Sequence, residues 1–270
     1  MTRKHIVSLT ILILAGIVTF HAVFFDEAGN ADVDRWRLPK ALREVSGLAV
    51  SDPQHVLTVT DEMAVVYSVD LSSGAVETTL RFGSPPVKGD FEGIALGPVG
   101  VFLITSDGLL YRSRGEPAPD GTTEYDEFDT GLGDVCEIEG LTWDDDALLI
   151  LCKNNYLEAD KHKLLIYRYV PGEKAASRFA EWPTERIAGG KRLTASGIYS
   201  NPNYIYIVDA KRKLFLLFGR DGSLVLSKSL HGHHQAEGIV MMPGGSVVIA
   251  DEGKDGGGTI TRYGRITGID

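Results

Sequence analysis

Short apolar segments recur along the chain, and each set of them begins at a glycine motif. The motif reads polar, apolar, a polar residue that is Glu or Ser, Gly, and then Leu or Ile. The copies lie at residues 44–48, 90–94, 137–141, 194–198 and 235–239. Their glycines are separated by 46, 47, 57 and 41 residues. The chain therefore contains a repeat at the scale of one small sheet.

A second apolar run follows each motif after a turn, and it ends in a polar residue 12 to 14 positions after the glycine. These polar residues are Asp61, Asp107, Asn154, Asp209 and Asp251. Flanking segments such as Val65–Val69 alternate between apolar and polar residues, as half-buried antiparallel strands require. Short strands repeated at this period are typical of propeller blades. We predict an all-β, five-bladed β-propeller.

Further segments complete this picture. Trp36–Leu38 is expected to pair with the last blade and close the ring, because an open propeller would leave strand edges unpaired. Long loops are expected at Gly115–Gly121 and around Asn154–Asp160, and a hairpin turn at Arg220–Ser223. No helix is predicted after the N-terminal segment.

The N-terminal segment runs from Ile6 to Phe25, 20 residues with His21 as the only ionisable group. At about 1.5 Å per residue it covers roughly 30 Å, the thickness of a bilayer's hydrocarbon core. Arg3 and Lys4 before it orient the N-terminus to the cytoplasm. We interpret residues 1–25 as an uncleaved signal anchor, a single transmembrane helix of the inner membrane. The alternative is a cleaved signal peptide and secretion.

The domain boundaries follow from this interpretation. Residues 26–34 are polar and acidic and are expected to form a linker, and residues 35–270 form the propeller domain in the periplasm. The formal net charge is −10. Because an acidic surface repels phosphates, nucleic acid and anionic lipid are not expected as partners.

Acidic residues gather in the motif. Side chains alternate along a strand, so the residues one and three before each glycine share a face. The innermost strands of a propeller surround a channel, and Glu92, Glu139 and Glu237 are expected to converge there. Converging carboxylates repel one another unless a cation lies between them. We predict a Ca²⁺ ion, which prefers oxygen ligands, with Asn154 and Asp209 as further ligands from the same rim.

Other polar residues are expected on this rim and are candidates for contacting a ligand. They are Asp61, Asp90, Asp107, Gln235, Asp251 and Glu252. The alternative interpretation of the motif is structural: its carboxylates accept backbone N–H groups from the adjoining blade and fix its position. Ser46 and Ser196 suit that alternative, because a hydroxyl can do the same.

Cys136 and Cys152 flank a hairpin whose turn is Asp144–Asp146. Antiparallel pairing brings them close, so they form either a disulfide in an oxidising periplasm or two small buried thiols. The segment His231–His234 precedes the fifth motif and is either a metal ligand or general base, or a solvated loop. A nucleophile elbow, a His-Glu-x-x-His motif and a phosphate-binding glycine loop are absent from the sequence.

The motifs at residues 90–93 and 235–238 resemble those of the bacterial SdiA-regulated family, and the resemblance spans residues 38–262. It implies a five-bladed propeller distantly like NHL repeats, with a calcium site and no settled biochemical function. The positions that match are Asp90, Glu92, Glu139, Gln235 and Glu237. The chain departs from the family pattern at Lys153-Asn154, where the family tends to have an acidic residue.

Three functions are compatible with these features of the sequence. The first is a membrane-anchored, periplasm-facing propeller that binds calcium and presents a rim to an envelope protein or a small ligand, without catalysis. The second is a calcium-dependent hydrolase of a lactone, ester or phosphoester. The third is an adaptor in which the acidic residues only lock the blades together. The missing nucleophile motif favours binding over catalysis.

Overall fold

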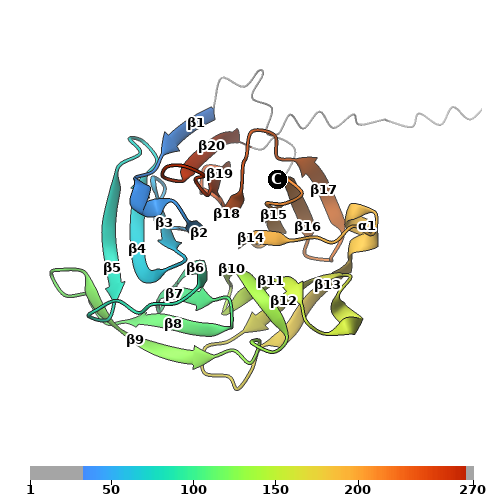
Figure 1. Cartoon of the computed structure of the whole chain (residues 1–270), viewed down its shortest axis with the longest axis horizontal. Helices are drawn as coiled ribbons and strands as arrows, with labels where there is room; N and C mark the ends of the chain where they lie inside the picture. Colours follow the sequence, from blue (N-terminus) through green and yellow to red (C-terminus); the bar gives the residue numbers. More distant parts are fainter. Residues whose placement is uncertain (1–32, 266–270) are drawn as a thin grey trace, which may run out of the picture.

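The computed structural model describes residues 33–265, and β-strands form nearly all of the regular structure there. The sheets stand around a central opening like the blades of a propeller (Figure 1). This confirms the prediction of a β-propeller. The predicted transmembrane helix at residues 1–25 lies outside the described residues. Among residues 33–265, no helix is long and apolar enough to cross a bilayer.

One sheet has eight strands, in the order β2-β3-β4-β5-β9-β8-β7-β6. They are β2 (Val45–Val50), β3 (His55–Thr60), β4 (Met63–Asp70), β5 (Val76–Phe82), β6 (Phe91–Gly97), β7 (Gly100–Thr105), β8 (Leu109–Arg114) and β9 (Thr122–Asp129). Each half is antiparallel, and two parallel residue pairs join the halves, Arg81 with Thr122 and Phe82 with Thr123. The sheet is therefore two four-stranded units joined at their outer edges.

Three sheets have four strands each. The first contains β10 (Cys136–Asp144), β11 (Ala147–Asn155), β12 (Lys163–Tyr169) and β13 (Ser177–Pro183). The second contains β14 (Ala195–Ser200), β15 (Tyr204–Asp209), β16 (Leu214–Gly219) and β17 (Leu224–Ser229). The third contains β18 (Ala236–Met241), β19 (Ser246–Asp251), β20 (Thr259–Arg265) and β1 (Val33–Arg37).

The N-terminal strand closes the ring. β1 pairs antiparallel with β20, and Trp36 lies opposite Ile260. This pairing confirms the role predicted for Trp36. The strand begins at Val33, so the last two residues of the predicted linker belong to β1.

The prediction that no helix follows the N-terminal segment was wrong. A short helix, α1 (Thr184–Ala188), follows β13, and two 3₁₀ turns lie at Lys40–Leu42 and Glu158–Asp160. In α1, the acidic residue Glu185 lies in the first turn, where its negative charge interacts favourably with the helix dipole. Gly189 ends the helix in the left-handed conformation, with φ 60°. One turn is too short to show the apolar periodicity by which helices are predicted.

The motif glycines lie in the inner strands, which are β2, β6, β10, β14 and β18. Each inner strand contacts the next, and β18 returns to β2. A Cβ atom added to Gly93 would lie 2.7 Å from the backbone nitrogen of Leu141 in the next inner strand. A Cβ atom added to Gly238 would lie 2.9 Å from the carbonyl carbon of Gly47. The motif therefore needs glycine because neighbouring inner strands approach too closely for a side chain.

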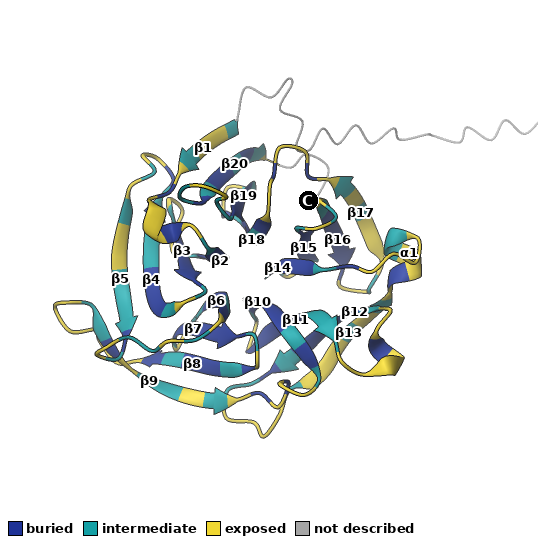
Figure 2. Ribbon diagram, viewed as in Figure 1, coloured by how far each residue is buried: buried dark blue, intermediate teal, exposed yellow. Residues whose placement is uncertain are grey.

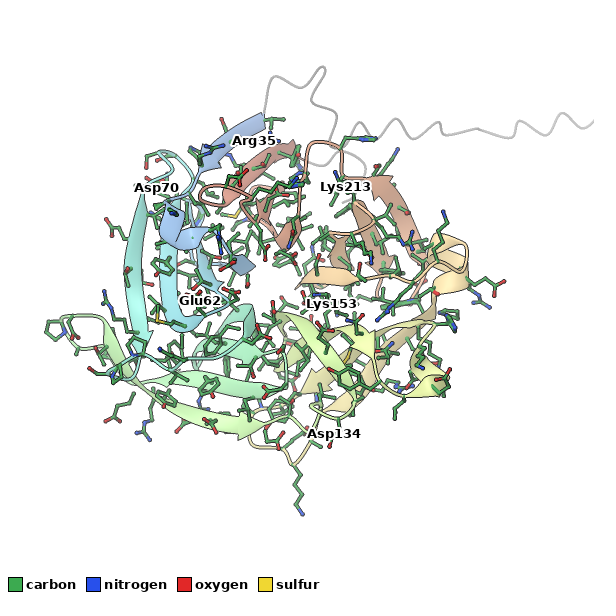
Figure 3. The ribbon with its side chains drawn as sticks, viewed as in Figure 1. Arg35, Glu62, Asp70, Asp134, Lys153 and Lys213 are labelled. Atoms are coloured by element: carbon green, nitrogen blue, oxygen red, sulfur yellow. A yellow bond between two sulfur atoms is a disulfide. The ribbon has the colours of Figure 1, made fainter. Side chains whose placement is uncertain are left out.

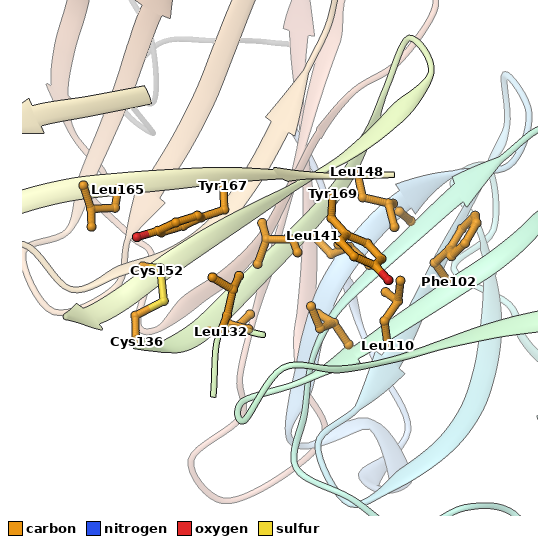
Figure 4. Packing of buried hydrophobic residues seen from close by; sticks show 14 residues of the cluster. Phe102, Leu110, Leu132, Cys136, Leu141, Leu148, Cys152, Leu165, Tyr167 and Tyr169 are labelled. Atoms are coloured by element: carbon orange, nitrogen blue, oxygen red, sulfur yellow. A yellow bond between two sulfur atoms is a disulfide. The ribbon is translucent and has the colours of Figure 1, made fainter. Parts of the chain in front are cut away.

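Apolar side chains fill the spaces between neighbouring units. The outermost strands are more exposed (Figure 2). The described residues form five such clusters. The cluster between β6–β8 and β10–β12 contains Phe102, Leu110 and Tyr169 (Figure 4). It also contains Cys136 and Cys152, which form a disulfide with Cα atoms 5.7 Å apart.

We expect Gly93→Ala to lower the free energy of unfolding, because the added methyl group would overlap the backbone of β10. Overpacking of this kind costs about 1–3 kcal/mol. The melting temperature should fall by several degrees, since about 1 kcal/mol corresponds to roughly 2–4 °C at this size. Thermal unfolding of the full-length protein, followed by tryptophan fluorescence, measures the change.

The matched control is Gly244→Ala, because a Cβ atom there would meet no other atom within 4 Å. Equal melting temperatures for the two variants would contradict the close approach of the inner strands.

Candidate functional site

The residues predicted to be functional meet at one rim of the propeller. Each inner strand begins there, and the second strand of each unit ends there: Glu137 pairs with Asn154, and Ala236 with Asp251. We call this edge the motif rim. The hairpins place the polar ends of both strands side by side, as the repeat predicted.

Glu92, Glu139 and Glu237, here called the axial glutamates, interact around a lysine. Lys153 lies beside the central opening (Figure 3). Its Nζ contacts Oε1 of Glu139, which is 3% exposed, and lies 3.6 Å from Oε1 of Glu137. The charge of Lys153 also acts on Glu92 and Glu237. The structure therefore brings the three predicted carboxylates together, with an ammonium group among them.

Burial governs the protonation of this cluster. It raises the pKa of Glu92 to about 9, and neighbouring carboxylates add to the rise. It also raises the pKa of Glu237 and of Glu139 above the ordinary value, and Lys153 opposes both shifts. Burial disfavours the charge on Lys153, but Glu139 and Glu137 outweigh it and raise the pKa of Lys153. At neutral pH the ammonium group is therefore charged and Glu92 holds a proton.

The two other predicted calcium ligands have different partners. Asn154 donates to Glu137 and accepts from the guanidinium group of Arg192. Asp209 is fully buried and accepts from the backbone N–H of Thr194 at 2.6 Å. Asn154 therefore holds the loop before β14, and Asp209 joins that loop to the turn after β15, where it accepts from the backbone N–H of Arg212 at 2.7 Å.

The axial donor set, as arranged, does not fit a calcium ion. Ca²⁺ requires six to eight oxygen ligands, and Nζ of Lys153 occupies the space beside Glu139. Among residues 33–265, no three or more His, Cys, Asp or Glu side chains are arranged to hold a metal ion. Calcium binding stays a prediction from the sequence.

Several predicted rim residues hold the ends of loops. Asp90 accepts from Oγ of Ser106 at 2.5 Å. Asp107 accepts from the hydroxyl of Thr105. Asp251 accepts from the backbone N–H of His234 at 3.0 Å and of the residue that follows it. Each of these hydrogen bonds lies within one blade and holds the end of a loop, so it differs from the contact with the adjoining blade that the structural alternative describes.

The remaining rim residues are Asp61, Gln235 and Glu252. Nε2 of Gln235 donates to Glu252 at 2.5 Å. Burial raises the pKa of Asp61, and the charge of Glu44 adds to the rise. Oδ1 of Asp61 is buried without a hydrogen-bond partner in the described part of the chain.

His233 has a structural position that the sequence did not reveal. It is 2% exposed, with Nδ1 2.6 Å from Oδ2 of Asp251 and Nε2 2.5 Å from the hydroxyl of Tyr263. Both ring nitrogens are therefore engaged inside the protein. The interpretation of this histidine as part of a solvated loop was wrong. A general base needs a free nitrogen to accept a proton, and the ring of His233 offers none in this arrangement.

A cleft of about 520 Å³, here called the rim cleft, opens beside Lys153 on the motif rim. Its lining side chains come mainly from the loops around β14, β15 and β18. They are Lys153, Asn154, Arg192, Thr194, Ser196, Ala210, Lys211, Lys213, His234, Gln235 and Glu237. Sequence reasoning missed Arg192, Lys211 and Lys213, because they lie in loops outside the repeated motif. Lys153, in β11, was identified from the sequence only as a departure from the family pattern.

The fold is similar to that of known propeller enzymes. The glutaminyl cyclase of Myxococcus xanthus superposes with a TM-score of 0.56 and 14% identity, over 86% of this chain and 94% of that chain. The virginiamycin B lyase of Staphylococcus aureus gives 0.51 and 13%, over 85% and 98%. The PQQ-bound aldose sugar dehydrogenase of Streptomyces coelicolor gives 0.50 and 14%, over 87% and 99%.

At these identities the similarity shows the propeller fold alone. No protein-family model matches the sequence, and no curated protein matches it significantly. The function therefore has to be argued from the site. The chain has the fold of a β-propeller.

We expect Glu92→Gln to change how stability depends on pH in metal-free buffer. The pKa of Glu92 is about 9 when folded and 4.5 ordinarily, so the folded state binds more protons between these values. The stabilisation from this group is complete below pH 4.5 and is lost as the pH rises towards 9. The melting temperature of Glu92→Gln relative to wild type should rise by at least about 2 °C between pH 5 and pH 9.

Glu116→Gln, on an exposed loop, is the control and should follow the wild type across this range. A Glu92→Gln curve that stays parallel to the wild-type curve would show that Glu92 is not a buried protonated acid.

Proposed function

We propose that this chain is a five-bladed propeller, anchored in the inner membrane by residues 1–25, that binds a small ligand in the periplasm without catalysis. Two observations support a count of five: the described residues contain five inner strands and five core clusters. The eight-stranded sheet counts as two blades, because only two residue pairs of its described register join its halves. The anchor and the periplasmic location rest on the N-terminal segment. The resemblance to the SdiA-regulated family is part of this proposal.

The observation that carries the proposal is the rim cleft. Its volume of about 520 Å³ is within the range of about 300–1,000 Å³ typical of small-molecule sites. Two of its lining residues belong to the axial cluster: Glu237 is one of the axial glutamates, and Lys153 contacts Glu139. An envelope protein that inserts a side chain into the cleft is the alternative partner.

A hydrolase is the less favoured function. It would need a metal ion to polarise its substrate, or a free base beside a nucleophile. The axial donor set does not fit calcium while Lys153 contacts Glu139. His233 uses both ring nitrogens inside the protein.

We further propose that Lys153 supplies the positive charge that the resemblance assigns to calcium. An ammonium group among partly buried carboxylates compensates their charge, as a divalent ion would. This explains why a lysine stands near the end of β11, the strand paired with the acidic motif of β10.

We expect calcium to leave the melting temperature of the full-length wild type unchanged relative to EDTA. Lys153→Met should lower the melting temperature in EDTA by several degrees, since an uncompensated carboxylate costs about 1–3 kcal/mol. Calcium should then restore part of the loss. Thermal unfolding at pH 7.5 measures all three values.

The control is Lys174→Met, on the exposed turn between β12 and β13 at the opposite rim. Stabilisation of the wild type by calcium would overturn the role of Lys153 and favour the calcium site.

A variant that fills the rim cleft tests whether a ligand binds there. In a thermal-shift screen of small polar compounds, those that stabilise the wild type should lose their effect in Lys211→Trp, whose indole would fill the rim cleft from an exposed position. Lys174→Trp should respond like the wild type. Compounds that stabilise Lys211→Trp equally, or a screen without any stabilising compound, would count against a ligand site in the cleft.

A further inference from the structure

We infer that the rim cleft and a neighbouring cleft together bind a small organic anion that also carries hydroxyl groups. The inference deepens the proposed function and rests on it. The neighbouring cleft, here called the side cleft, has a volume of about 250 Å³ and shares Lys153 and Arg192 with the rim cleft. A ligand can therefore contact both clefts across these two side chains.

The lining charges are mostly positive. The rim cleft has four basic side chains, Lys153, Arg192, Lys211 and Lys213, and one carboxylate, Glu237. The side cleft is lined by basic, polar and apolar residues, and no carboxylate is among them in the described structure. Charges of one sign in a cleft raise the local concentration of the opposite ion. An anion is therefore favoured, although the whole chain carries a charge of −10.

Three of these cations have no carboxylate partner. Within residues 33–265, Arg192, Lys211 and Lys213 form no ion pair, whereas arginines elsewhere, such as Arg112 and Arg178, are paired with aspartates. Arg192 uses one nitrogen to donate to Asn154, so further N–H groups can bind a ligand. A guanidinium group binds a carboxylate or phosphate through two parallel hydrogen bonds.

The side cleft also has unsatisfied oxygens. Oδ1 of Asn155 and Oγ1 of Thr184 are buried and lack a hydrogen-bond partner among the described residues, and Thr184 is 2% exposed. Nδ2 of Asn155 donates to the carbonyls of Asp160 at 2.7 Å and Lys163 at 2.8 Å. The free oxygen can therefore only accept, and it needs a donor.

These two features define the class of ligand. The cationic groups select a carboxylate or phosphate, and the oxygen of Asn155 selects a hydroxyl hydrogen. An apolar acid would leave that oxygen without a donor, so it should bind more weakly than an acid that also carries hydroxyl groups. Sugar acids and sugar phosphates have both groups.

Isothermal titration calorimetry on the full-length protein tests this with a matched series. D-Gluconate has a carboxylate and hydroxyls, sorbitol has the hydroxyls alone, and hexanoate has the carboxylate alone. We expect gluconate or sorbitol 6-phosphate to bind at least tenfold more tightly than sorbitol and hexanoate. The comparison of gluconate with sorbitol 6-phosphate distinguishes a carboxylate from a phosphate ligand.

Arg192→Gln should weaken binding of the anion at least tenfold, while Arg186→Gln, on the exposed face of α1, should bind like the wild type. Affinity should also fall as salt rises. Equal affinity for sorbitol and gluconate, equal affinity for hexanoate and gluconate, or full affinity in Arg192→Gln would each overturn the inference. If compounds blocked by Lys211→Trp bind but no hydroxylated anion does, the proposed function stands and this inference fails.

Discussion

The structure depends on the close approach of neighbouring inner strands around the central opening. At Gly93, a single added carbon would lie 2.7 Å from the backbone of the next inner strand. This approach fixes the angle between neighbouring units, and the apolar clusters then fill the wedge-shaped spaces farther from the axis. It also brings acidic side chains on successive inner strands close together. The glycine allows the strands to pack closely. The glutamate next to it in the same motif brings carboxylates together that repel one another.

The electrostatic consequence is a cluster of carboxylates in a partly buried place. Such a cluster can bind a divalent ion, retain protons, or include a basic side chain. This chain combines the last two, because Lys153 contacts Glu139 and burial keeps a proton on Glu92. One lysine near the end of β11 thus adds a positive charge to a cluster in which the motif alone would place only carboxylates.

Much of the fold could be predicted from the sequence, because the repeat marks where the inner strand and the second strand of each unit lie. The ring closure by Trp36 was also predictable from the need to cover strand edges. The candidate site was less predictable from the sequence than the fold. The motif identified Glu92, Glu139 and Glu237, but Asn154 and Asp209 bind to loops that the repeat does not describe. Arg192 and Lys211 belong to those loops, and pairing of His233 with Tyr263 depends on tertiary contacts that no local pattern contains.

The pairing of β1 with β20 affects the order in which the protein can fold. The strand made first completes the sheet made last, with Val33 opposite Tyr263, so the ring cannot close until synthesis of the propeller is nearly finished. Contacts between such distant segments require closure of a very long loop and slow the folding of β proteins. Until then β20 has an open edge, and a newly synthesised chain would be most prone to aggregation at that stage.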